Sequence, residues 1–114
     1  MTSPTYGEIS MERIAALISQ LANESGEVYN VMVGTDSQNF DKTKVVVVIA
    51  FHHVGHGGIF CYEITHVRRL NNLGQKLLYE TQLSLECARK LVDAFENLKD
   101  ETGFNYERHL NLCI

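Results

Sequence analysis

The spacing of apolar residues along the chain predicts an alternation of helices and strands that begins with a helix. This helix is expected to start at Ser10, a residue type that caps helices, and to run to about Asn23, with Gly26 as its stop. One side of the helix is available to cover a sheet. Its apolar residues recur at the three- and four-residue intervals of a single helical face, namely Met11, Ile14, Leu17, Ile18 and Leu21.

Three strands are predicted next, joined by short connections. The first spans residues 29–35, with alternate side chains on opposite faces, and a turn region follows at 39–42. The second spans 44–53 and is apolar on both faces, which predicts an interior strand covered on two sides. A tight reversal at 55–58 (Gly-His-Gly-Gly) leads into the third, over 59–67. The three strands are therefore expected to form an antiparallel meander.

A long amphipathic helix is predicted from about Leu73 to Leu98, with Gly103 as its break, followed by a fourth strand over 106–113. The sequence stops at that strand, so we expect a C-terminally truncated domain in which no further strand pairs with the outer edge of this fourth strand. An unpaired apolar strand edge is a template for another chain. We therefore expect a homodimer formed through this edge.

Composition limits the class of protein. A chain of 114 residues with 45% hydrophobic residues and one proline is expected to form a single globular domain over residues 1–114. No apolar run approaches the roughly 18 residues that span a membrane, and no signal peptide is recognisable. The three cysteines lie far apart and form no zinc motif, which predicts reduced thiols and a cytoplasmic location.

Asp36 is the first candidate for chemistry. It follows the first predicted strand in the segment 34–38 (Gly-Thr-Asp-Ser-Gln), with its side chain expected on the face of Met32 and Gly34. A carboxylate at a strand end that projects over a sheet face can hold a divalent metal. The alternative is that Asp36 and Ser37 cap the following turn.

Glu80 is the second candidate, because it lies about 40° from Ser84 on the apolar side of the long helix. An ionised side chain on a buried stripe is costly unless it is paired or bound to a metal. The alternative places Glu80 at the edge of the stripe, reaching water, Arg68 or Arg69. Glu86 points to the opposite side and is expected to be solvated. The stripe consists of Leu77, Ser84, Ala88, Leu91, Phe95 and Leu98.

Positive charge and histidines provide weaker signals. Arg68 and Arg69 precede the long helix and can meet a nucleic-acid backbone, although ordinary solvated charge explains them equally well. The net charge of −4 argues against broad, charge-driven nucleic-acid binding, but metal ions can supply local positive charge in a nuclease. The adjacent His52 and His53 point to opposite faces of a strand, so no zinc site is expected there.

The order and spacing of these segments resemble the YkuK family of RNase H-like proteins. The resemblance covers about Ile9 to Leu112 and is carried by the segment 34–38, the pair Gly57-Gly58 and the stretch 77–88. It implies an α/β, RNase H-like fold, in which an antiparallel three-strand meander and a further strand pack against helices. Such folds place acidic residues on the first strand, on the first helix after the meander and at the fourth strand.

The resemblance makes Asp36 the first of these acidic residues and Glu80 the second. It puts the third at Asn111, where the family pattern has Asp, and an amide is a neutral and weaker metal ligand. The implied site would bind Mg²⁺ or Mn²⁺ through Asp36, Glu80 and Asn111, with one ion activating a water and a second stabilising the leaving oxygen. Ser37 would position a phosphate or a water. With Asn111 in place, this site is expected to be impaired.

Two functions remain as hypotheses. The first is a divalent-metal-dependent nuclease that hydrolyses phosphodiester bonds in RNA, DNA or a hybrid. The second is a non-catalytic RNase H-like module that binds nucleic acid or another protein, which Asn111 and the missing later strand and helices favour. Convergence of the Asp36 and Glu80 carboxylates would support the nuclease, whereas their separation would favour the non-catalytic module.

Overall fold

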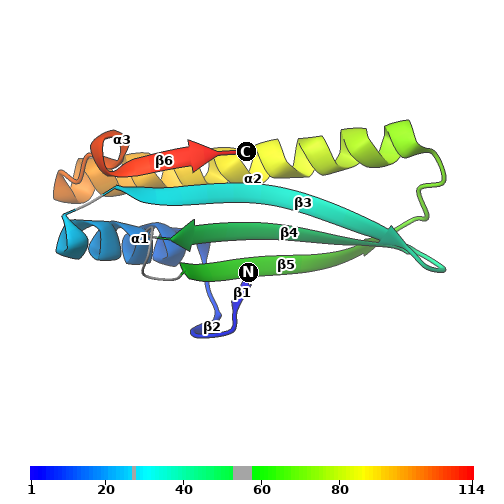
Figure 1. Ribbon diagram of the computed structural model, residues 1–114, viewed down its shortest axis with the longest axis horizontal. Coiled ribbons are helices and arrows are strands. Elements are labelled where there is room, and N and C mark those ends of the chain that lie inside the picture. Colours follow the sequence, from blue (N-terminus) through cyan, green and yellow to red (C-terminus); the bar gives the residue numbers. More distant parts are fainter. Residues whose placement is uncertain (27, 53–57) are drawn as a thin grey trace.

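The computed structural model describes residues 1–26, 28–52 and 58–114, which form one six-stranded sheet and three helices (Figure 1). The strand order across the sheet is β2-β1-β5-β4-β3-β6. Along the chain the elements are β1 (Thr2–Ser3), β2 (Gly7–Glu8), α1 (Met11–Ser25), β3 (Tyr29–Asn39), β4 (Thr43–His52), β5 (Gly58–Val67), α2 (Leu73–Thr102), α3 (Tyr106–His109) and β6 (Leu110–Cys113).

Helix α1 begins and ends at the residues that its sequence signals predict. The Ser10 hydroxyl accepts a hydrogen bond from the Arg13 N–H at 3.2 Å and caps the first turn. Gly26 adopts φ 68°, a left-handed conformation, and its N–H donates to Ala22 O at 3.1 Å. The predicted helix is confirmed and runs two residues further than expected, to Ser25.

The antiparallel meander of β3, β4 and β5 is also confirmed, but β3 is longer than predicted. It continues to Asn39, so that Asp36 lies inside the strand, opposite Val46, and not at its end. The Thr43 hydroxyl donates to Asn39 Oδ1 at 2.6 Å where the two strands meet the turn. Backbone pairing with β4 therefore extends the strand through polar residues. The predicted reversal lies mostly outside the described residues, which omit 53–57.

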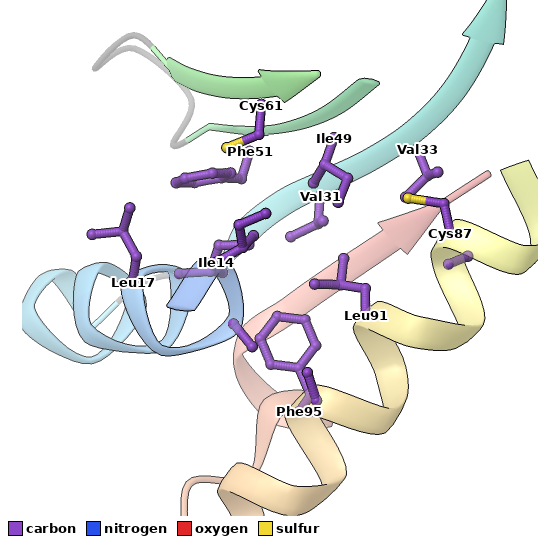
Figure 2. Close-up of a cluster of buried hydrophobic side chains, with 14 of the residues drawn as sticks. Ile14, Leu17, Val31, Val33, Ile49, Phe51, Cys61, Cys87, Leu91 and Phe95 are labelled. Atoms are coloured by element: carbon purple, nitrogen blue, oxygen red, sulfur yellow. The ribbon is translucent and has the colours of Figure 1, made fainter. Parts of the chain in front are cut away.

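Helices α1 and α2 pack on the same face of the sheet. Figure 2 shows Ile14 of α1 and Leu91 and Phe95 of α2 gathered beneath the strand residues of that face. Their strand partners occupy alternate positions, as a two-residue period requires. The buried apolar residues of β3, β4 and β5 are Val31, Val33, Val45, Val47, Ile49, Phe51 and Cys61.

The opposite face of the sheet is open in the described part of the chain. Along β4, buried positions alternate with half-buried ones, so the prediction that this strand is covered on two sides was wrong. Val46, Val48 and Ala50 are apolar, but they are shielded mainly by the neighbouring strands β3 and β5. A continuous apolar run thus identified an interior strand without identifying what covers it.

Helix α2 is 30 residues long and is covered along only part of its length. Asn72 caps its start by accepting from the Gln75 N–H, and Gly103 ends it at φ 77°. All its buried residues lie at or after Ser84. Leu77, predicted to be buried, is 54% exposed. Within the described ranges, no helix is long and apolar enough to cross a membrane.

The predicted fourth strand is shorter than expected, since residues 106–109 form the helical turn α3. This turn brings the Tyr106 ring into a stacked contact with Phe95, with ring centroids 5.4 Å apart. The Tyr106 hydroxyl also donates to Glu96. Strand β6 then pairs in parallel with the first residues of β3. It forms one edge of the sheet, as predicted.

Candidate functional site

Asp36 projects from the open face of the sheet. It is exposed, and its Oδ1 accepts a hydrogen bond from the backbone N–H of Ser37 at 2.9 Å. Lys44 of β4 lies on the same face of the sheet as Asp36 and makes no ion pair with any described residue. Together these side chains border an open concavity of about 520 Å³. It is lined by Gly34, Thr35, Asp36, Gln38, Lys44, Val46 and Val48.

Glu80 contacts the sheet from the helix-covered face. The buried Ser37 hydroxyl donates to Glu80 Oε1 at 3.1 Å. One turn further along α2, the hydroxyls of Ser84 and Thr35 lie 2.7 Å apart. These two contacts join α2 to the second half of β3. The prediction that Glu80 faces the packed side of the helix is confirmed, and its partner is a serine and not an arginine.

The two carboxylates therefore do not converge on one side of the sheet. Asp36 and Ser37 are consecutive strand residues, so their side chains leave the backbone on opposite faces. Glu80 lies on the same face of the sheet as the Ser37 side chain, whereas Asp36 faces the open concavity on the other side. A divalent ion needs its oxygen ligands at about 2.0–2.6 Å. In this arrangement the strand backbone lies between the two candidate ligands.

Asn111 is far from both carboxylates, and the prediction that it shares their site was wrong. In the parallel register it lies beside Asn30, to whose Oδ1 its side-chain amide donates at 3.3 Å. Asp36 is six residues further along β3, or about 20 Å at roughly 3.3 Å per residue. The helical turn α3 takes up residues 106–109, so β6 begins at the level of Tyr29 and ends beside Met32.

The expected ligand set for Mg²⁺ or Mn²⁺ is thus distributed over three places. Asp36 lies on the open face, Glu80 on the covered face and Asn111 near the other end of β3. Among residues 1–26, 28–52 and 58–114, no three His, Cys, Asp or Glu side chains form a group that could hold a metal ion. These residues do not fit the two-metal site that the sequence resemblance implies.

Arg68 and Arg69 lie on a second, more polar concavity of about 650 Å³ at the start of α2. Arg69 is fixed, because its guanidinium donates to Asn71 Oδ1 at 2.8 Å and to the Phe40 carbonyl. Arg68 makes no hydrogen bond or ion pair within the described ranges. The other lining residues are Leu70, Asn71, Asn72, Gln75, Leu78, Tyr79 and Gln82.

A polar network that the sequence did not reveal holds this loop in place. The Asn39 side-chain amide donates to Leu70 O at 2.9 Å, and the Leu70 N–H donates to the Thr43 hydroxyl at 2.8 Å. The helix residues of the concavity gave a local signal, since Gln75, Tyr79 and Gln82 recur at helical spacing. Their polar character alone did not distinguish them from an ordinary solvated face.

A four-strand core in the order β5-β4-β3-β6, with β6 parallel to β3 and both long helices on one face, is consistent with an RNase H-like α/β fold. Residues 11–113 match the family described as Ribonuclease H-like, so the chain belongs to that family. The resemblance to the YkuK family is confirmed by this match. No curated protein and no solved structure gives a significant match to the chain.

Proposed function

We propose that this chain is a nucleic-acid-binding module of the RNase H-like fold that does not, by itself, assemble a two-metal hydrolytic site. The observation that carries the proposal is the separation of Asp36 and Glu80 by the backbone of β3. Two-metal hydrolysis needs carboxylates that bridge ions about 3.5–4 Å apart. The family membership supports nucleic acid as the partner.

Positive charge at one end of the molecule supports the same partner. Five of the ten lysine and arginine residues gather where the β3–β4 turn meets the start of α2, at the right-hand end in Figure 1. Among the described residues of these segments, the carboxylates are those of Asp36, Asp41 and Glu80. A chain of net charge −4 thus has a locally basic end that can neutralise phosphates. The basic residues are Lys42, Lys44, Arg68, Arg69 and Lys76.

Arg68 and Arg69 would have different roles in binding a nucleic-acid backbone. Arg69 is held by Asn71 and by the Phe40 carbonyl, so its contribution is to set the shape of the loop. Arg68 is exposed and has no partner in the described residues, so its guanidinium is available to a phosphate. Ser37 is buried against Glu80, which makes it a structural contact and a poor candidate for binding substrate.

A metal-dependent nuclease is the second candidate, and one observation favours it. Ser37 contacts both carboxylates, through its backbone N–H to Asp36 and through its hydroxyl to Glu80. Asp36 and Glu80 therefore both contact Ser37, although their side chains lie on different faces of the sheet. Catalysis of this kind would require Glu80 to leave Ser37 and Asp36 to gain further ligands.

Calorimetric titration with Mg²⁺ and with Mn²⁺ distinguishes the two functions. It should be run on the parent chain and on the variants Asp36→Asn and Glu80→Gln, with Glu86→Gln as a matched control on the solvated side of α2. We expect no stoichiometric site that either Asp36→Asn or Glu80→Gln abolishes. A site lost in both variants, together with hydrolysis of labelled RNA, DNA or hybrid, would instead support the nuclease.

Binding itself is tested by fluorescence anisotropy with labelled oligonucleotides. The variant Arg68→Gln should weaken binding and reduce the slope of log K against log salt by about 0.7–0.9, the value for one lost phosphate contact. Arg89→Gln, on the exposed side of α2, is the matched control. Equal affinity and equal salt slope for the parent and Arg68→Gln would exclude Arg68 from the interface.

A further inference from the structure

The loop between β5 and α2 is held at two positions by one buried residue. Thr43, the first residue of β4, is polar but fully buried. In the register of β4 and β5 it pairs with Val67, the last residue of β5. Its hydroxyl also accepts a hydrogen bond from the Leu70 N–H at 2.8 Å. The chain therefore leaves Thr43 at Val67 and returns to it at Leu70.

Both backbone polar groups of Leu70 are bound by side chains from the β3–β4 turn. The Asn39 amide donates to Leu70 O at 2.9 Å, while the Leu70 N–H donates to Thr43. The Thr43 hydroxyl in turn donates to Asn39 Oδ1 at 2.6 Å, which closes a ring of three hydrogen bonds. Leu70 is only half-buried, and water can satisfy backbone groups at such positions. Side-chain partners in place of water fix where the loop lies.

Arg68 and Arg69 are the two residues between these fixed positions. The Arg69 guanidinium is already engaged, because it donates to Asn71 Oδ1 and to the Phe40 carbonyl. Arg68 is exposed and has no hydrogen bond or ion pair in the described part of the chain. A two-residue segment that is fixed at both ends has few backbone conformations available to it. Arg68 therefore presents a free guanidinium from an ordered backbone.

We propose that Thr43, together with Asn39, is a positioning residue for the phosphate contact of Arg68. The inference rests on the nucleic-acid-binding function proposed above and assigns a role to a residue that cannot touch a phosphate itself, since Thr43 is fully buried. Binding a phosphate costs the free energy of ordering the arginine and its loop. A loop that is already ordered loses less freedom, so the contact with Arg68 contributes more to the affinity.

A role of Thr43 in stability alone is the alternative, because a buried hydroxyl with two hydrogen bonds also stabilises the domain. The two roles differ in the salt dependence of binding. A loss of stability does not change how many phosphates the folded protein contacts. A displaced Arg68 removes one contact, which lowers the slope of log K against log salt by about 0.7–0.9. A substitution that changes no charge would then reduce the salt slope.

The test is fluorescence anisotropy of the full chain with labelled single-stranded and duplex oligonucleotides at several salt concentrations. Thr43→Val removes the hydroxyl but keeps the shape, and its affinity should fall to within about twofold of that of Arg68→Gln, with the same reduced salt slope. Thr43→Ser keeps the hydroxyl and should restore both. Ser19→Ala is the matched control, since it removes another buried hydroxyl, bonded to Ala15 O in α1 at the other end of the molecule (Figure 1). It should change neither quantity.

Two further variants keep the test independent of how well Thr43→Val folds. Asn39→Ala alters a half-buried residue and removes the bond to Leu70 O, so it should weaken binding and lower the salt slope in the same way. In the double variant, adding Thr43→Val to Arg68→Gln should change the affinity by less than about twofold, because the contact is already lost. Thermal unfolding of each variant establishes that it is folded at the temperature of the binding assay.

The outcomes keep this inference separate from the function on which it rests. Parent-like affinity and salt slope in Thr43→Val and Asn39→Ala, with both reduced in Arg68→Gln, would overturn the positioning role and leave nucleic-acid binding in place. Weaker binding with an unchanged salt slope, or weaker binding that Thr43→Ser does not restore, would do the same. Absence of any nucleic-acid binding by the parent chain at low salt would overturn both.

Discussion

The Ser37 hydroxyl donates a 3.1 Å hydrogen bond to Glu80 Oε1 and so ties β3 to α2 across 43 residues of sequence. Ser37 is buried and Glu80 is partly exposed. The bond satisfies a hydroxyl that would otherwise be buried among apolar neighbours. It also fixes Glu80 on the face of the sheet opposite to Asp36. This contact therefore ties an early turn of α2 to the sheet and holds Glu80 on the face away from Asp36.

The strength of this contact can be measured with a double-mutant cycle. Ser37→Ala and Glu80→Ala should show a coupling energy of about 1 kcal/mol in urea unfolding, the magnitude of a partly solvated hydrogen bond. The control pair is Ser37→Ala with Glu86→Ala, which should show none because Glu86 is paired with Lys90 on the exposed side. A coupling near zero for Ser37 and Glu80 would contradict the role assigned to this bond.

Restoring an acidic residue at position 111 should not create a metal site. The variant Asn111→Asp places a carboxylate beside Asn30, about 20 Å along β3 from Asp36. We expect calorimetry to detect no Mg²⁺ or Mn²⁺ binding beyond that of the parent chain. The opposite outcome would be a stoichiometric site in Asn111→Asp that disappears when Asp36→Asn is added, and it would mean that β6 pairs with β3 in another register.

The three thiols should differ strongly in reactivity. Cys113 is exposed, whereas Cys61 and Cys87 are buried. Burial, reinforced by the negative charge of Glu63, raises the pKa of Cys87 to about 11, and burial also raises the pKa of Cys61. Since only the thiolate attacks, a disulfide reagent at mildly alkaline pH should give one fast phase. Cys113→Ser should remove that phase. A fast phase that survives this substitution would show that a buried thiol is accessible.

The homodimer that the sequence predicts can be tested at the edge strand β6. This strand occupies one end of the sheet, and Leu112 on it is 38% exposed. An unpaired edge with apolar side chains favours pairing with a second edge. Light scattering over a range of concentrations should detect a dimer that Leu112→Lys weakens and that Leu78→Lys, on the exposed side of α2, does not. A strict monomer at high concentration would contradict the prediction.

The predictions that the structure confirms rest mostly on local signals. Ser10 and Gly26 bound α1, and Gly103 ends α2, because caps and left-handed residues act within one turn of the chain. Alternation along β3 correctly separated the buried Val31 and Val33 from the exposed Met32 and Gly34. The resemblance to a known family supplied the RNase H-like fold class, which no local pattern contains.

The errors involve contacts between distant segments. Asp36 lies inside a strand because β4 pairs with β3 beyond the apolar residues, and the pairing of two strands cannot be read from either one alone. The position of Asn111 depends on where β6 enters the sheet, which the α3 turn sets through Tyr106 and Phe95. Predicting the site therefore required the strand register, which one sequence does not contain.

The uneven coverage of α2 has a consequence for its dynamics. Its turns before Ser84 contain no fully buried residue and are tied to β3 by the bond from Ser37 to Glu80, while the later turns belong to the core. An isolated helical segment shorter than about 12–15 residues, such as the part of α2 before Ser84, is only marginally stable in water. Amides between Leu73 and Ser84 should consequently exchange with deuterium through local opening, and those after Cys87 only through global unfolding. Glu80 thus lies in a part of the helix that can be remodelled without melting the domain.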